Sequence, residues 1–310
     1  MNSELGEFGA QSALVAAGQN AEWALWLTVL MTIAGGVIFL FVLWAIASAW
    51  RSDGGGRTWW IVGGGVIFPI VTLAVLFALS TFALRAIAGP QDEELVIEVT
   101  GHQYWWDVVY DPEGVALRDA NEVFLPVGRP VTLRLKSDDV IHSFWVPSIA
   151  GKMDMIPGRV NELTVTATEV GRYRGQCAEF CGLSHPLMSF EAVALEPEAF
   201  ATFLGNLQGE ARDPVRPQER QGQEVFVEAG CPACHTIRGV AEGAQIGPDL
   251  TRVGGRASLG AGMWEMNLGN LAGWISDVQD MKPGAEMPSY NHLSGPDLRA
   301  VAAYLESLSQ

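Results

Sequence analysis

The stretch that decides the fold is Cys177-Ala178-Glu179-Phe180-Cys181-Gly182-Leu183-Ser184-His185-Pro186-Leu187-Met188, and a second imidazole, His142, precedes it. It gathers two thiols, an imidazole and a thioether in one short segment. Such soft ligands suit copper in electron-transfer sites on β-folds. Because two cysteines are present, they can bridge two coppers that share one electron. From the spacing alone, two other interpretations stay open: a disulfide between the cysteines, and a zinc site.

The residues around this stretch have the pattern of short strands. The β-rich runs are Leu95–Thr100, Trp105–Tyr110, Val131–Leu135 and Leu163–Thr168, and they are separated by Pro112, Gly114, Pro126, Gly128 and Pro130. Several short strands at this spacing are typical of a β-sandwich or barrel. We therefore predict an all-β domain over residues 89–204.

Upstream, the chain has the composition of a membrane anchor. Residues 23–50 carry no charge, and a helix of that length spans ~42 Å, enough to cross a ~30 Å hydrocarbon core. A second uncharged run, residues 58–84, opens with Trp59 and Trp60 as interfacial anchors. Small residues such as Gly63, Gly64 and Gly65 favour close helix packing in a bilayer. We predict a two-helix hairpin within residues 23–88, after a tail of residues 1–22.

Charge fixes the expected orientation of the hairpin. The connecting loop holds Arg51, Asp53 and Arg57, whereas the tail holds acids and no base. Positive charge favours the cytoplasmic side, so we expect the tail and everything after the hairpin on the outer side. A signal peptide is the alternative, but the tail lacks a basic start and the first apolar run is too long for one.

The last third of the chain has a different motif. A linker is expected over residues 205–217, as a hinge between separately folded units. The string Cys231-Pro232-Ala233-Cys234-His235 follows, and C-x-x-C-H predicts covalent c-type haem on the two cysteines with His235 on the iron. A redox dithiol or half a zinc site is the alternative. Both are disfavoured, because the flanks look helical (218–229, and 298–308 after a Ser294 cap) and only His292 is a further ligand nearby.

An electron-carrying haem needs a second axial ligand, and a thioether raises its potential. Met263, Met266, Met281 and Met287 all follow the motif. The string Lys282-Pro283-Gly284-Ala285-Glu286-Met287-Pro288 resembles the ligand loop of bacterial class I cytochromes c, so Met287 is preferred over Met281. An all-α cytochrome c domain is expected over residues 218–310. Covalent haem attachment takes place outside the cytoplasm, which agrees with the predicted orientation.

The overall charge indicates which classes of binding partner to expect. The 310 residues carry 19 Lys and Arg against 35 Asp and Glu, a formal net charge of −16. Nucleic-acid binding is disfavoured, because it depends on basic surfaces. An acidic surface instead attracts cationic partners, such as a basic protein.

The copper-type segment resembles the binuclear copper (CuA) site of cytochrome c oxidase subunit II. The resemblance extends over residues 20–200 and includes Gly101-His102-Gln103-Tyr104-Trp105-Trp106, residues 139–147 and residues 152–159. It implies a cupredoxin-like Greek-key β-sandwich. It also implies two coppers bound by His142, Cys177, the Glu179 carbonyl, Cys181, His185 and Met188, and a Glu179 side chain that faces a magnesium ion at the boundary with subunit I. The family's usual Trp after the Gln, the electron entry point, is replaced here by Tyr104, so we expect the path along Tyr104, Trp105 and Trp106.

Together, these features resemble subunit II of caa3-type oxidases, in which a cytochrome c domain is fused to the CuA domain. We expect one covalent haem and two coppers that pass single electrons from a donor, a cytochrome c or a respiratory complex, to subunit I, which reduces O2 to water. The other partners are further membrane subunits of a bacterial inner-membrane complex, with the copper and haem domains on the periplasmic side. Two alternatives stay open: the inlet subunit of a CuA-containing nitric oxide reductase, and a copper-delivery or redox-sensing membrane protein.

Overall fold

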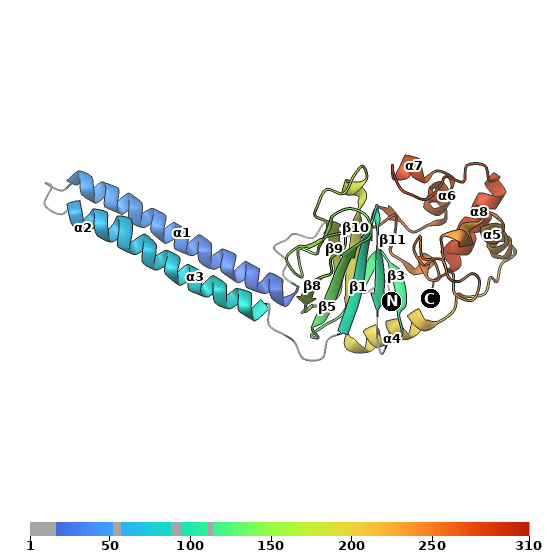
Figure 1. Ribbon diagram of the computed structural model, residues 1–310, viewed down its shortest axis with the longest axis horizontal. Coiled ribbons are helices and arrows are strands. Elements are labelled where there is room, and N and C mark those ends of the chain that lie inside the picture. Colours follow the sequence, from blue (N-terminus) through green and yellow to red (C-terminus); the bar gives the residue numbers. More distant parts are fainter. Residues whose placement is uncertain (1–16, 52–56, 88–94, 111–113, 310) are drawn as a thin grey trace. The chain divides into compact units, whose positions relative to one another are not determined.

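The computed structural model describes residues 17–51, 57–87, 95–110 and 114–309. The chain divides into two compact units, one of residues 20–92 and one of residues 1–19 with 93–310 (Figure 1). The predicted loop residue Asp53 and the predicted turn residue Pro112 lie outside the described residues.

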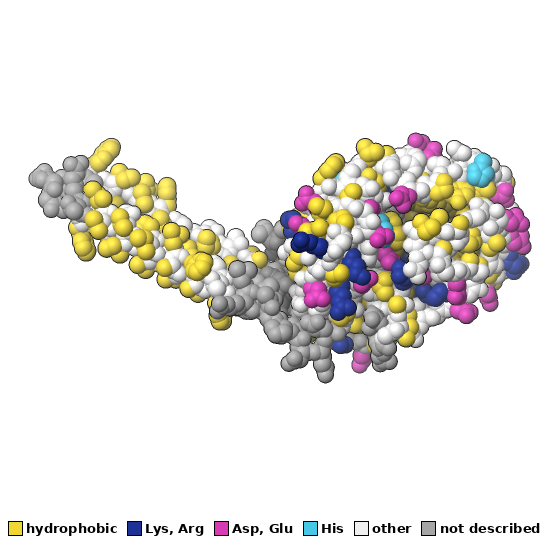
Figure 2. Space-filling model, viewed as in Figure 1, with side chains coloured by type: hydrophobic (Ala, Val, Ile, Leu, Met, Phe, Trp, Pro, Cys, Tyr) yellow, Lys and Arg dark blue, Asp and Glu magenta, His cyan; other side chains and the backbone are white. Residues whose placement is uncertain are grey.

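The first unit is a helical hairpin. It comprises α1 (Gln19–Arg51), α2 (Arg57–Val62), a π-helical turn η1 (Gly63–Ile67) and α3 (Phe68–Ile87). The two stretches Ala21–Ser48 and Gly63–Phe82 are long and apolar enough to cross a membrane, which confirms the predicted spans. Hydrophobic side chains cover both helices (Figure 2), and large ones such as Trp26 (70% exposed) and Phe77 (74%) face outward. Gly64 lies against the Phe41 ring, where a β-carbon would be 3.3 Å from it, so the glycine does permit close packing.

The second unit begins with a β-sandwich of two five-stranded sheets. One sheet has the order β3-β2-β1-β5-β8 and the other the order β4-β10-β9-β6-β7. The strands are β1 (Leu95–His102), β2 (Trp105–Tyr110), β3 (Leu117–Ala120), β4 (Glu122–Pro126), β5 (Val131–Ser137), β6 (His142–Trp145), β7 (Met153–Met155), β8 (Asn161–Val165), β9 (Gly171–Cys177) and β10 (Ser189–Leu195). The pairs β1–β5 and β4–β10 are parallel and the others are antiparallel. Three predicted strands are confirmed as β1, β2 and β5; the fourth, predicted over residues 163–168, appears shifted as β8 (Asn161–Val165), within a cupredoxin-like sandwich.

Strand pairing in the second sheet brings His142 close to the Cys177–Met188 segment. Strand β9 ends at Cys177 and β10 begins at Ser189, so the segment 178–188 is the connection between two antiparallel neighbours. Strand β6 pairs with β9 through Phe144 and Cys177, and it begins at His142. His142 thus reaches the same end of the sheet although it lies far away in sequence.

Helices follow the sandwich. They are α4 (Pro197–Gln208), α5 (Pro217–Glu228), α6 (Leu268–Ser276), α7 (Val278–Met281) and α8 (Gly295–Ser307), with 3-10 turns η3 (His185–Leu187), η4 (Cys231–Ala233) and η5 (Val253–Gly255) and a small hairpin of β11 (Ser258–Leu259) and β12 (Trp264–Glu265). The predicted helices appear as α5 and α8, and the Ser294 side chain caps α8 by accepting from the Asp297 N–H. Because α4 continues through Gln208, the expected linker shrinks to residues 209–216.

The sandwich and the helical domain are not separated by a free hinge. The Asp119 carboxylate on β3 accepts hydrogen bonds from Arg256 at 2.9 and 3.1 Å and pairs with Arg252 at 3.5 Å. All three side chains are buried. Breaking a buried ion pair from one side costs about 3–5 kcal/mol, so this contact holds the two domains in one unit.

The two described residues before α1, Ala17 and Gly18, pack against the sandwich. The Ala17 N–H donates to the Ser148 carbonyl at 2.7 Å, and the Thr168 N–H donates to the Ala17 carbonyl at 2.8 Å. Ala17 is fully buried.

Candidate metal centre and haem cavity

The two thiols of the Cys177–Met188 segment lie at the centre of a ligand cluster. Their sulfurs are 3.9 Å apart. His142 Nδ1 is 3.8 Å from the Cys177 sulfur, and His185 Nδ1 is 3.6 Å from the Cys181 sulfur. The Met188 sulfur is 3.7 Å from that of Cys181, and the Glu179 carbonyl oxygen is 3.2 Å from that of Cys177. All of the residues predicted from the sequence as copper ligands thus converge on two sulfurs.

The donor set fits soft metals. Cys177, Cys181 and Met188 are buried, and His142 has no exposed surface. No disulfide joins the cysteines. The contact between the thiols lowers the pKa of Cys177 and raises that of Cys181, because the two sulfurs compete for one proton. A thiolate is the form that binds a metal.

Asp139 orients His142 and was missed as a site residue. Its carboxylate lies 2.7 Å from His142 Nε2, which leaves Nδ1 directed at Cys177. Burial lowers the pKa of His142, but the bonds with Asp139 and Cys177 outweigh it and raise the pKa to about 9. A carboxylate behind a ligating imidazole fixes its tautomer and its direction. The proximity of Asp139 to His142 in sequence was the available signal.

Gly101 gives the His142 ring its room. A β-carbon there would lie 2.9 Å from His142 Cδ2, closer than side chains tolerate. Trp106 packs edge-on against the same ring, with centroids 6.1 Å apart, and its Nε1–H donates to the Ser189 carbonyl. The Gly101-to-Trp106 segment thus supports the cluster from behind.

The Glu179 side chain points away from the sulfurs. It is 46% exposed, and a carboxylate oxygen lies 3.9 Å from Lys152 Nζ. The Glu179 carbonyl therefore faces the Cys177 sulfur, whereas its carboxylate lies near Lys152 at the surface.

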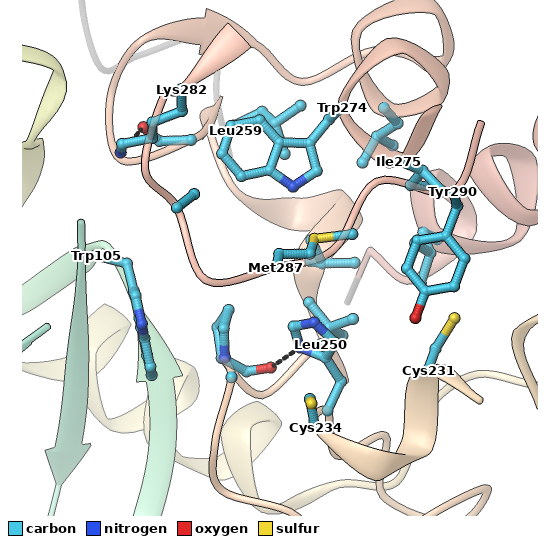
Figure 3. Close-up of a pocket in the computed structure, with 18 of the residues that line it drawn as sticks. Trp105, Cys231, Cys234, Leu250, Leu259, Trp274, Ile275, Lys282, Met287 and Tyr290 are labelled. Carbon is cyan, nitrogen blue, oxygen red and sulfur yellow. Dashed lines mark hydrogen bonds between the residues drawn. The ribbon is translucent and has the colours of Figure 1, made fainter. Parts of the chain in front are cut away.

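A cavity, called the haem-type cavity below, brings together the residues predicted to bind haem. Cys231, Cys234, His235 and Met287 all line it. Figure 3 shows the Met287 sulfur and both thiols around the same space. Of the other methionines, Met266 also lines the cavity, whereas Met281 packs beside Gly273 of α6, 3.6 Å from where a β-carbon would stand. The geometry favours Met287 over Met281.

His235 is held with one nitrogen available. Its Nδ1 lies 2.9 Å from the Pro248 carbonyl, which accepts the Nδ1–H and leaves Nε2 free. Burial lowers the pKa of His235, which favours the neutral ring, the form that can act as a metal ligand. Gly247 allows this approach, because a β-carbon there would be 2.6 Å from His235 Cε1. Gly247 and Pro248 are neighbours in sequence, so one short loop both makes room for the His235 ring and fixes its orientation.

The sandwich forms one wall of the haem-type cavity. Gln103, Tyr104, Trp105 and Asn121 line it together with the cysteines and Met287. The Trp105 ring is visible on that side in Figure 3. Sequence reasoning assigned the cavity to the helical domain alone and missed this wall.

Comparisons with known proteins agree with this geometry. The family "Cytochrome C oxidase subunit II, periplasmic domain" matches residues 112–194, and the family "Cytochrome c" matches residues 220–309. Cytochrome c oxidase subunit 2 of Alkalihalophilus pseudofirmus is 39% identical over 255 residues, which cover 81% of this chain and 72% of that protein. The chain belongs to the cytochrome c oxidase subunit II family.

Two further matches have the same description. Cytochrome c oxidase subunit 2 of Bacillus subtilis is 30% identical over 264 residues, covering 81% of this chain and 73% of that protein. The crystal structure of the periplasmic domain of subunit II from Bradyrhizobium japonicum is 30% identical, with a TM-score of 0.36, and covers 38% of this chain and 96% of that one.

Membership settles the coarse function. This subunit II carries a fused cytochrome c domain, as the caa3-type resemblance predicts, and it is the electron-entry subunit of a membrane-anchored oxidoreductase. Its two domain families bind CuA copper and haem c. Its extramembrane part is a periplasmic-type domain.

Proposed function

We propose that this subunit receives electrons at its haem domain and delivers them from its copper domain to subunit I, which reduces O2 to water. The observation that carries the proposal is the shared wall. Tyr104 and Trp105 of the sandwich line the cavity that holds Cys231, Cys234, His235 and Met287. When bound, the copper pair and the haem iron accept and release single electrons.

Six residues are proposed to hold two coppers: His142, Cys177, Glu179 through its carbonyl, Cys181, His185 and Met188. Their mutual distances of 3.2 to 3.9 Å around the two sulfurs support this assignment. Cys231 and Cys234 are proposed to attach one haem, with His235 and Met287 on the iron. The free Nε2 of His235 and the position of Met287 in the cavity support this.

The path between the two sites is proposed to follow Tyr104 and Trp105. The Tyr104 hydroxyl lies between two loops: a β-carbon at Gly182, next to Cys181, would be 2.5 Å from it, and one at Gly284 would be 3.6 Å away. Trp106, by contrast, is fully buried in the sandwich core. We therefore assign Trp106 to the support of His142 rather than to the path.

The remaining assignments concern the partners. The exposed Glu179 carboxylate is proposed to bind a magnesium ion shared with subunit I, because hard cations take oxygen ligands. A cationic donor, such as a cytochrome c, fits the net charge of −16. The complex is proposed to lie in a bacterial inner membrane, with further membrane subunits and with the copper and haem domains on the periplasmic side.

Gas consumption by the purified complex tests the terminal reaction. With reduced cytochrome c as donor, we expect O2 consumption that stops when copper is removed. Consumption of nitric oxide without that of O2 would overturn the oxidase and favour the nitric oxide reductase.

A further inference from the structure

Lys282 is a buried amine at the junction of the two domains. Its exposed fraction is 2%, and its Nζ donates to the Tyr104 carbonyl of the sandwich at 2.7 Å and to the Gly260 carbonyl of the β11–β12 turn at 2.8 Å. Figure 3 shows it at the border of the haem-type cavity. Among the described residues, no carboxylate comes within ion-pair distance of it.

Burying a lysine is costly unless its donors are satisfied. Burial lowers the pKa of Lys282 to about 7. Both the ammonium and the neutral amine have enough N–H groups for two carbonyl acceptors. The contact therefore persists in either protonation state, and its effect is on position rather than on charge.

The lysine starts the loop that ends with Met287. The following residue, Pro283, accepts a hydrogen bond at 2.7 Å from the Ser184 hydroxyl, which lies in the copper-ligand loop. Gly284 has a φ of +80° and lies beside Tyr104 and Leu183. The segment 282–284 is thus fixed to the Tyr104 turn and to the 181–188 loop at once.

Other contacts also hold the two domains together. Arg256 pairs with Asp119, the Ala257 N–H donates to Glu122 at 2.7 Å, and the Ser189 N–H donates to the Ala261 carbonyl at 3.0 Å. Loss of the Lys282 contacts is therefore expected to release the ligand loop without separating the domains.

We propose that Lys282 is a positioning residue for electron transfer within this chain: it fixes the Met287 loop on the Tyr104 turn so that the two redox sites keep one separation. The inference rests on the proposed function, in which electrons cross this junction. Electron transfer between two sites slows as their separation grows, so a loosened ligand loop lowers the transfer rate.

The test uses the complete oxidase complex with Lys282→Met in this subunit. Arg134→Met is the control, because Arg134 is 49% exposed and pairs with Glu162 across β5 and β8, and it lines neither the haem-type cavity nor the contacts of Lys282. An electron is injected photochemically into the haem domain, and its arrival at copper is followed optically. Hydrogen exchange of residues 282–288 and 100–106 is measured on the same samples.

We expect Lys282→Met to slow the internal transfer severalfold and to speed hydrogen exchange in both segments. The haem absorption, the haem potential and the copper EPR signal should stay those of the parent. Arg134→Met should change none of these quantities. An unchanged transfer rate in Lys282→Met, with both sites intact, would overturn the inference.

Two further results are informative. If Lys282→Met does not assemble, Ser184→Ala replaces it, since it removes only the bond to Pro283; faster exchange of residues 282–288 by about fivefold is expected, and unchanged exchange overturns the inference. If the parent complex shows no transfer from haem to copper, the proposed function fails instead, and the exchange data alone decide the positioning role.

Discussion

At the scale of single residues, a substitution of Met188 is expected to affect the proposed copper site and to leave the proposed haem site unchanged. It is buried in the sandwich, and its sulfur lies 3.7 Å from the Cys181 sulfur. Met188→Leu conserves volume, so a stability loss below ~1.5 kcal/mol is expected. Because the thioether is lost, the copper potential should shift and internal transfer should slow, as a redox titration and flash kinetics would show.

The haem serves as the internal control for this variant. Met188 does not line the haem-type cavity. The haem absorption should therefore be unchanged, and a shift of the haem band with normal copper would contradict our assignment of the two sites to separate domains.

Gly247 offers a comparable test at the proposed haem site. An added β-carbon would lie 2.6 Å from His235 Cε1, so either the ring or the loop must move. Gly247→Ala should cost about 1–3 kcal/mol in thermal unfolding and shift the haem potential. Gly205→Ala is the control, because nothing lies within 4 Å of its β-carbon position in α4. Equal behaviour of the two variants would contradict the role of Gly247.

At the scale of elements, strand β4 places the buried Glu122 where the sandwich meets the helical domain. Glu122 is 3% exposed and accepts from the Ala257 N–H at 2.7 Å. Burial, with the neighbouring Asp119 charge, raises the pKa of Glu122 from 4.5 to about 7. The folded chain thus holds a proton that the unfolded chain has lost, and stability falls as pH rises from 4.5 to about 7.

Glu122→Gln tests this dependence. The amide oxygen can still accept from Ala257, and it carries no charge. The variant should exceed the parent in stability by roughly 2–4 kcal/mol at pH 8 and match it below pH 4.5, in denaturant unfolding at each pH. A constant difference at all pH values would show that Glu122 is not the titrating group.

Elements also show what the sequence could and could not predict. The spans, four strands and two helices were predicted, because apolar runs and alternation are local. The full ligand sets of the two proposed sites came from resemblance to known families, since spacing alone left other interpretations open. Strand β10 was missed because all of its residues are buried, so it shows no alternation. The contacts of Lys282 with Tyr104 and of Arg256 with Asp119 join residues far apart in sequence, and no local pattern records such pairing.

At the scale of the whole molecule, the second unit contains both proposed redox sites. The copper-ligand loop and the haem-ligand loop are joined by the Ser184–Pro283 hydrogen bond, and the sandwich supplies part of the haem-type cavity. The expected hinge between separately folded domains is thus replaced by a fixed junction. Internal transfer in this subunit should therefore not depend on a docking step between its domains.

Metal and haem analysis of the isolated chain, combined with EPR, tests the central claim most directly. The account predicts two copper atoms for each covalently bound haem, with the EPR signal of one unpaired electron shared by both coppers. A single zinc ion, or a cystine joining Cys177 and Cys181, would contradict it.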